Sequence, residues 1–246
     1  MLFLLCTNII PLFGDNSTET EAPATTAAST AGETTTETAT ETEAEPKEPF
    51  ISKKDFAALK EQYPHIYAWI EIPGTYIDYP LIQHPEDDNY YLRRSAEGYY
   101  SVNGCVFSEH RYNSTDFSDP ITLLYGHYVK QYDGYKFFGG LQSIYGEELE
   151  TNGEIIIYHP DKELHYEIFA ATPYNSYHIL AGSNYTKPRQ FNDFIEGLKH
   201  IKNAEAVINR DYEVEAGDNL LVLSTCYNGN TKRRFIVVAK LVEVFD

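Results

Sequence analysis

Short apolar runs separated by turn residues dominate the chain from residue 50 onward. The runs are rich in β-branched and aromatic side chains and are bounded by Pro, Gly, Asn and Asp, which predicts strands. The eight predicted strands span 67–72, 77–82, 104–107, 121–125, 154–158, 164–171, 220–223 and 235–244. Many short strands with few helices predict a mainly β domain, built as a barrel or a sandwich.

Two stretches follow the helical period instead. The stronger one lies between the strands at 164–171 and 220–223, and its apolar residues recur at i, i+3, i+4, i+7 and i+10. These residues are Phe191, Phe194, Ile195, Leu198 and Ile201. The other spans 52–62, where Ser52 and Asp55 suggest a capping box and Pro64 ends the helix. A short helix at 136–145 and one or two helical turns at 86–92 complete the prediction.

The first 49 residues do not have the pattern of a globular domain. Residues 2–13 are largely apolar but too short to span a bilayer, so we interpret 1–14 as the end of a membrane anchor whose start is missing. A disordered terminus with chance hydrophobicity is the alternative. Residues 15–49 are rich in Thr, Glu and Ala and predict a disordered linker. We therefore expect residues 50–246 to form a single folded domain that one N-terminal anchor tethers outside a membrane.

The charge of the chain excludes one class of partner. The net charge is −18, and the nine acidic residues and one lysine of 15–49 carry −8 of it. The folded domain therefore carries the remaining −10. Phosphate binding requires a basic face, so nucleic acid is not an expected partner.

Three cysteines, Cys6, Cys105 and Cys226, are too few for a disulfide scaffold, and their spacing fits no metal motif. No metal or cofactor is expected. An unpaired thiol on a protein outside the membrane suggests a chemical role for Cys226, although a buried structural cysteine is the alternative.

Three residues at strand ends suggest acyl transfer. Cys226 ends the apolar run 219–226, His127 follows the run 121–125 and Gly126, and Arg234 opens the last run. A thiol reacts as its thiolate, a histidine can carry the proton, and a guanidinium can stabilise an oxyanion. The chain has eight histidines, so composition alone does not select His127.

Strand alternation restricts the neighbours of these residues. Ser224 projects to the same face as Cys226, whereas Thr225 faces the other way. Arg233 and Arg234 also face opposite ways, so only one of them can point at the thiol.

The segments that hold these residues resemble the signature segments of sortases, the cysteine transpeptidases of Gram-positive cell surfaces. They are Leu223-Ser-Thr-Cys226, Tyr125-Gly-His127 and Arg234-Phe-Ile-Val-Val-Ala239. Segments 68–80, 88–92, 104–107 and 136–141 resemble class B sortases, as do the two longer predicted helices. The resemblance covers about residues 50–246.

This resemblance implies a fold and a set of roles. The fold is an eight-stranded sortase-type β-barrel with an N-terminal helix and a helix inserted before the cysteine strand. Cys226 would attack the carbonyl of a Thr in a C-terminal sorting motif and form a thioester. His127 would protonate the leaving amine and accept a proton from the incoming one, and Arg234 would bind the substrate or stabilise the oxyanion. Ser224 and Thr225 are the candidate substrate-binding residues.

The implied partners are secreted proteins with a C-terminal sorting signal and an acceptor amine from peptidoglycan. The implied location is the extracytoplasmic face of a Gram-positive cell membrane. A pilin-polymerising sortase that uses a pilin lysine, and a catalytically idle binding module, remain alternatives. A papain-like protease is disfavoured because its cysteine precedes its histidine.

The sequence departs from the class B pattern near the thiol. Tyr227 stands where an acidic residue is common, Tyr128-Val129 where Asn-Met is common, and the segment from Cys226 to Arg234 is short. These departures leave the substrate preference and any contribution of Arg233 open.

Overall fold

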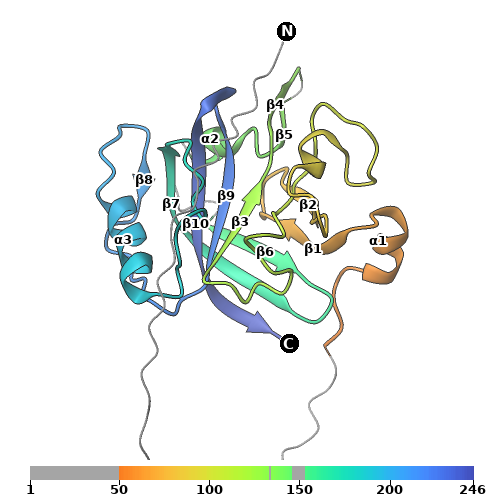
Figure 1. Cartoon of the computed structure of the whole chain (residues 1–246), viewed down its shortest axis with the longest axis horizontal. Coiled ribbons are helices and arrows are strands. Elements are labelled where there is room, and N and C mark those ends of the chain that lie inside the picture. The colour runs from red at the N-terminus through yellow and green to blue at the C-terminus, as the bar shows by residue number, and fades with distance from the viewer. Residues whose placement is uncertain (1–49, 133, 146–152) are drawn as a thin grey trace, which may run out of the picture. The chain divides into compact units, whose positions relative to one another are not determined.

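The computed structural model describes residues 50–132, 134–145 and 153–246, which fold into a curled β-sheet with few helices (Figure 1). The sheet has eight strands in the order β2-β1-β6-β7-β10-β9-β3, with β8 paired to β7. The strands are β1 (Ile66–Glu71), β2 (Asp78–Ile82), β3 (Ile121–Tyr125), β6 (Glu154–Tyr158), β7 (Glu163–Tyr174), β8 (Val207–Ile208), β9 (Leu220–Tyr227) and β10 (Asn230–Phe245). The predicted mainly β class is confirmed. The predicted anchor at 1–14 and linker at 15–49 lie outside the described residues.

A short segment closes the curled sheet by joining its two edge strands. Phe107 exchanges backbone hydrogen bonds of 3.0 and 2.8 Å with Tyr125 at the end of β3. On its other side, Ile82 of β2 donates to Val106 and accepts from Ser108, at 3.3 and 3.1 Å. The prediction of a strand at 104–107 is wrong, because this segment makes only isolated bridges. Its role is to complete the barrel.

Two apolar clusters pack against opposite faces of the sheet. Leu221 and Leu223 of β9 belong to the cluster on the concave face. Leu220 and Val222 belong to the cluster between the sheet and α3 (Pro188–Lys199). Strand alternation therefore explains the continuous apolar run before Cys226, because both faces of β9 are covered. A strand that is buried on both sides gives its end a fixed position.

The helices follow the predicted pattern with corrections at their ends. The periodic helix is confirmed as α3, whose buried residues are Phe191, Phe194, Ile195 and Leu198. The N-terminal helix is α1 (Phe56–Gln62), and its N-cap is Asp55, which accepts from Ala57 N and Ala58 N at 3.1 Å each. The predicted capping role of Ser52 is therefore wrong, because the helix begins after Asp55. None of the helices in the described part of the chain is long and apolar enough to cross a membrane.

Smaller elements gather at the end of the barrel where β9 turns into β10 (Figure 1). The hairpin of β4 (Tyr128–Gln131) and β5 (Gly134–Phe137) was not predicted, and it precedes α2 (Leu141–Ile144). The predicted helix at 136–145 is therefore shorter than expected. The turns at 86–92 are a single 3-10 helix, η1 (Tyr90–Arg93).

Candidate active site

Cys226 and Arg234 lie opposite each other on β9 and β10. Asn228 and Gly229 both have positive φ and make the two-residue hairpin turn, so Tyr227 pairs with Asn230. An irregularity in β10 between Asn230 and Arg234 then brings Arg234 opposite Cys226. Without these three extra residues, Thr231 would face the thiol. The Arg234 Nη1 lies 3.9 Å from Cys226 Sγ.

The two adjacent arginines point in different directions, as alternation requires. Arg234 is anchored by its Nη1, which donates to the Thr231 carbonyl at 2.8 Å. Arg233 instead stacks over the ring of Tyr227, with its guanidinium carbon 4.6 Å from the ring centre. The Tyr227 hydroxyl in turn donates to Glu205. Tyr227, at the position where class B sortases often carry an acid, thus holds Arg233 away from the thiol.

His127 reaches the same place from β3, which runs parallel to β9. Gly126 N donates to the Ser224 carbonyl at 3.1 Å, which extends this pairing to the residue before His127. The His127 Nε2 lies 2.8 Å from the Leu92 carbonyl oxygen. A carbonyl only accepts, so this contact places the ring proton of the neutral imidazole on Nε2 and leaves Nδ1 as the basic nitrogen.

Two glycines make room for the imidazole and its strand. A Cβ on Gly104 would lie 2.9 Å from His127 Cδ2 and 2.7 Å from the Tyr91 carbonyl oxygen, and Gly104 has φ +58°. A Cβ on Gly126 would lie 2.6 Å from the ring of Phe138. A side chain at either position would displace its neighbours.

One small pocket of about 80 Å³ is lined by all three residues, together with Leu92, Phe107, Tyr125, Gly126, Ser224 and Thr225. A second pocket of about 70 Å³ shares Tyr125, Ser224 and Arg234 with it and continues along residues 174–179. We call the two together the Arg234 groove. Ser224 is buried and lines both pockets. Thr225 is also buried, and its Oγ1 has no hydrogen-bond partner among the described residues.

Gln142, in α2, holds the backbone of the thiol residue. Its Nε2 donates to the Cys226 carbonyl at 3.3 Å, and its Oε1 accepts from Asn228 N at 3.1 Å. The side chain therefore fixes the strand end and the turn at once. Sequence reasoning missed it, because nothing distinguishes a glutamine 84 residues upstream until the chain has folded.

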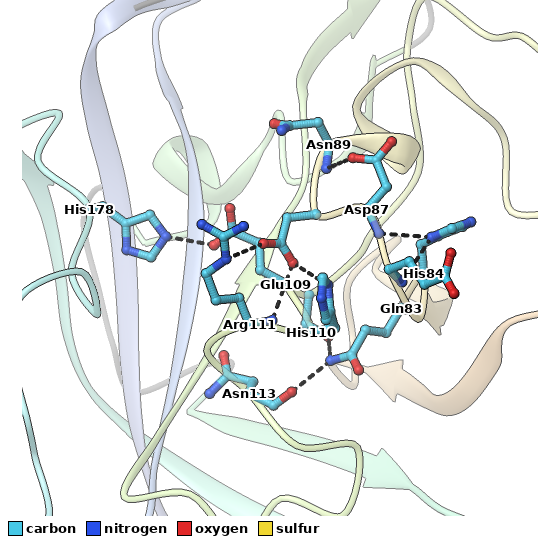
Figure 2. A network of polar contacts seen from close by, with 12 residues as sticks. Gln83, His84, Asp87, Asn89, Glu109, His110, Arg111, Asn113 and His178 are labelled. Carbon is cyan, nitrogen blue, oxygen red and sulfur yellow. Dashed lines mark hydrogen bonds and ion pairs between the residues drawn. The ribbon is translucent and has the colours of Figure 1, made fainter. Parts of the chain in front are cut away.

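A polar cluster holds one wall of the Arg234 groove, and Figure 2 shows its contact between His178 and Glu109. The His178 Nδ1 accepts from Leu180 N and Ala181 N at 3.1 Å each, so its Nε2 carries the proton and donates to Glu109 Oε2 at 2.6 Å. The Tyr125 hydroxyl lies 3.1 Å from the same Nε2. Burial, and then the charge of Glu109, raise the pKa of Tyr125, so this hydroxyl stays protonated. The cluster ties the 174–181 wall to β3, two residues before His127.

The remaining thiol in the described part of the chain has a different environment. Cys105 is buried, and burial followed by the charge of Glu97 raises the pKa of its thiol. A neutral, buried thiol is a poor nucleophile. No group of three His, Cys, Asp or Glu side chains in the ranges 50–132, 134–145 and 153–246 is arranged to hold a metal ion.

Comparisons with known proteins agree with this geometry. A family model described as the sortase domain matches residues 70–242. Sortase B of Listeria monocytogenes is 27% identical over 177 residues, which cover 71% of this chain and 68% of that protein.

Solved structures give the same result. Bacillus anthracis sortase B has a TM-score of 0.65 and 27% identity, with 78% of this chain and 85% of that chain covered. A Streptococcus pyogenes class B sortase involved in pilus biogenesis has a TM-score of 0.63 and 27% identity, with 76% and 98% covered.

Proposed function

The chain belongs to the sortase family, in its class B-like branch, and from this premise we propose the reaction that it performs. It cleaves a C-terminal sorting motif after Thr and transfers the acyl group to a peptidoglycan amine. The observation that carries the proposal is the meeting of Cys226, His127 and Arg234 in one pocket. These residues supply a nucleophile, a proton carrier and an oxyanion donor.

The first half of the reaction forms a thioester. The Cys226 thiolate attacks the carbonyl carbon of the Thr, and the charge moves to the carbonyl oxygen. Arg234, 3.9 Å from the sulfur, is placed to donate to that oxygen. As the intermediate collapses, the C–N bond breaks and protonated His127 gives its proton to the leaving amine.

The second half restores the enzyme. The acceptor amine attacks the thioester carbonyl, a new C–N bond forms and the C–S bond breaks. The proton of the amine passes to His127, and Cys226 leaves as the thiolate. The imidazole changes its protonation state twice and ends as it began, so the reaction needs no external proton donor.

The Arg234 groove is the proposed site of the sorting motif. It runs from Cys226 past Arg234 to residues 174–179 and follows the ends of β9 and β10. Ser224 lines the groove on the Cys226 face and is the first candidate for a substrate contact. Thr225 lines the catalytic pocket, and we propose that it contributes to binding there.

The proposed setting is the extracytoplasmic face of a Gram-positive membrane, with residues 1–14 as part of the anchor. The proposed partners are secreted proteins with a sorting signal, and peptidoglycan as the acceptor. The likeness to a class B sortase involved in pilus biogenesis supports a second candidate, in which a pilin lysine supplies the amine.

Substitution of the thiol tests the proposal. A panel of peptides with the C-terminal sorting sequences of secreted proteins from the same genome serves as donor substrates. The unmodified enzyme should cleave at least one of them after Thr. Cys226→Ala should abolish cleavage while the circular dichroism spectrum stays unchanged. Cleavage retained in this variant would rule out the proposed reaction, and cleavage by neither protein would favour an idle binding module.

A further inference from the structure

A larger cavity lies beside the catalytic pocket and shares no lining residue with it. Its volume is about 350 Å³, against about 80 Å³ for the catalytic pocket. It lies between β2, β5 and the loop that leads to the barrel-closing segment. We call it the Glu97 cavity. Its polar lining residues are Ser95, Glu97, Ser101, Asn103 and Lys136, and its aromatic ones are Tyr63, Tyr79 and Phe137.

The wall between the Glu97 cavity and the catalytic pocket is thin. Gly104, Cys105 and Val106 line the cavity, whereas the next residue, Phe107, lines the catalytic pocket. Gly104 packs directly on the imidazole, because a Cβ there would lie 2.9 Å from His127 Cδ2. At Gly104, a ligand in the cavity is therefore separated from His127 by backbone atoms alone.

Glu97, which is exposed, brings a negative charge to the lining of the cavity. Burial first, and then the charge of Glu97, raise the pKa of Tyr63 and of Cys105, which line different parts of the cavity. An ammonium group is therefore favoured at this position. Lys136 is the other charged side chain of the lining. Together they fit a peptide that carries both an amine and a carboxylate.

Two further features of this loop fit a binding site. The Ser95 hydroxyl oxygen is buried but has no hydrogen-bond partner among the described residues. Buried polar groups are normally paired, so this oxygen marks a point in the cavity wall where a partner is missing. On the same loop, Tyr99 and Tyr100 are 75% and 71% exposed. Large exposed aromatic side chains that gather at one place mark binding surfaces.

We propose that the Glu97 cavity binds the acyl acceptor, a peptide with a free primary amine and a carboxylate. This inference rests on the proposed function, since it assigns the second substrate of the same reaction. In the acyl-enzyme the donor fills the Arg234 groove, so the acceptor needs another approach. From the cavity its amine nitrogen passes over Gly104 to the thioester carbonyl. The C–N bond then forms as the C–S bond breaks, and the proton goes to His127.

The test compares the rates at which the acyl-enzyme reacts with different nucleophiles. A donor peptide is mixed with enzyme and one of three nucleophiles: water, hydroxylamine, or the tripeptide L-Ala-γ-D-Glu-L-Lys. Water and hydroxylamine are small and need no cavity, so they report the thioester alone. Two variants change the cavity, Glu97→Gln by charge and Asn103→Trp by volume. Their matched controls are Glu86→Gln, on a neighbouring loop, and Val102→Trp, beside Asn103 but 69% exposed and not part of the lining.

We expect Glu97→Gln to lower kcat/KM for the tripeptide about fivefold, the scale of one exposed ion pair. Asn103→Trp should lower it more than tenfold, while hydrolysis and hydroxylamine transfer stay within about twofold and both controls behave as the unmodified enzyme. Equal tripeptide transfer in variants and controls would overturn the assignment, as would an equal fall with hydroxylamine. If the unmodified enzyme forms no acyl-enzyme, the proposed function fails, and this inference fails with it.

Discussion

The Arg234 groove and the Glu97 cavity lie on two sides of the catalytic pocket, but they differ in charge and in how their polar groups are paired. In the groove, Arg234 is positive, and Glu109 and His178 bond each other at 2.6 Å. In the cavity, Glu97 is exposed and Ser95 Oγ has no partner in the described part of the chain. Paired groups fix the shape of a wall, whereas an exposed charge such as that of Glu97 remains available to a ligand. This difference supports the proposal that the Arg234 groove binds the donor in one fixed position and that the Glu97 cavity binds a charged acceptor.

The largest effect on catalysis should come from removing the charge of Arg234 in the groove. Arg234→Ala should lower kcat for donor cleavage by about 10²–10³, the usual cost of an oxyanion donor. Arg233→Ala is the matched control and should change kcat by less than about threefold, because Arg233 packs on Tyr227. Steady-state kinetics with one donor peptide gives both values. The reverse ranking would show that the wrong guanidinium has been assigned to the thiol.

This choice between the arginines shows what the sequence could predict. Strand parity showed that only one of the two arginines can point at Cys226, and the resemblance selected Arg234. They did not reveal the bulge of β10 that selects Arg234, because a bulge depends on both partner strands. The segment at 104–107 looks like a strand because its residues are apolar, but it bridges two edges instead. Gln142 and Glu109 gain their roles only through contacts 84 and 69 residues away.

A smaller effect on catalysis is expected from Gln142, which holds the end of the strand that carries Cys226. Gln142→Leu removes the bonds to the Cys226 carbonyl and to Asn228 N, each worth about 1 kcal/mol. It should lower kcat about tenfold and leave KM within about twofold, because the thiol loses its position but the groove remains. Gln142→Glu keeps the acceptor for Asn228 N and should recover part of the loss. An unchanged kcat in the Gln142→Leu variant would remove Gln142 from the site.

A change in the wall of the Arg234 groove should affect donor binding selectively. Glu109→Gln removes the charge that His178 Nε2 contacts at 2.6 Å, which loosens the 174–181 wall. The KM for the donor should rise about three- to tenfold, with kcat and tripeptide transfer nearly unchanged. Glu86→Gln, which removes the same charge elsewhere, serves as control. A fall in tripeptide transfer without a change in donor KM would contradict the assignment of the donor to the groove and of the acceptor to the cavity.

The smallest effect lies outside both the groove and the cavity and concerns stability alone. Burial lowers the pKa of His165, but its bonds to Glu163 and Glu154, at 2.8 and 2.6 Å, raise it above the usual value overall. A raised pKa means that the charged form stabilises the fold at low pH, below about 6.5, and that this contribution is lost as pH rises through the folded value.

His165→Gln should therefore lower Tm by about 2–4 °C at pH 5.5 and by less at pH 8.5. Thermal unfolding at the two pH values measures the difference, with the exposed His200→Gln as control. A larger loss at pH 8.5 would contradict the sign, and altered acceptor transfer would show that the far end of the barrel is not independent of the groove and the cavity.

The mass of the acyl-enzyme is the most direct test of the proposed reaction. The roles of the Arg234 groove and of the Glu97 cavity both depend on a thioester at Cys226. Unmodified enzyme is mixed, without acceptor, with an intact donor peptide that it is known to cleave. The mixture is then quenched in acid and digested. We expect a mass increase equal to the donor fragment ending at Thr, on the peptide that contains Cys226, and its release by hydroxylamine. Donor cleavage with the adduct on another residue would contradict the assignment of Cys226 as the nucleophile.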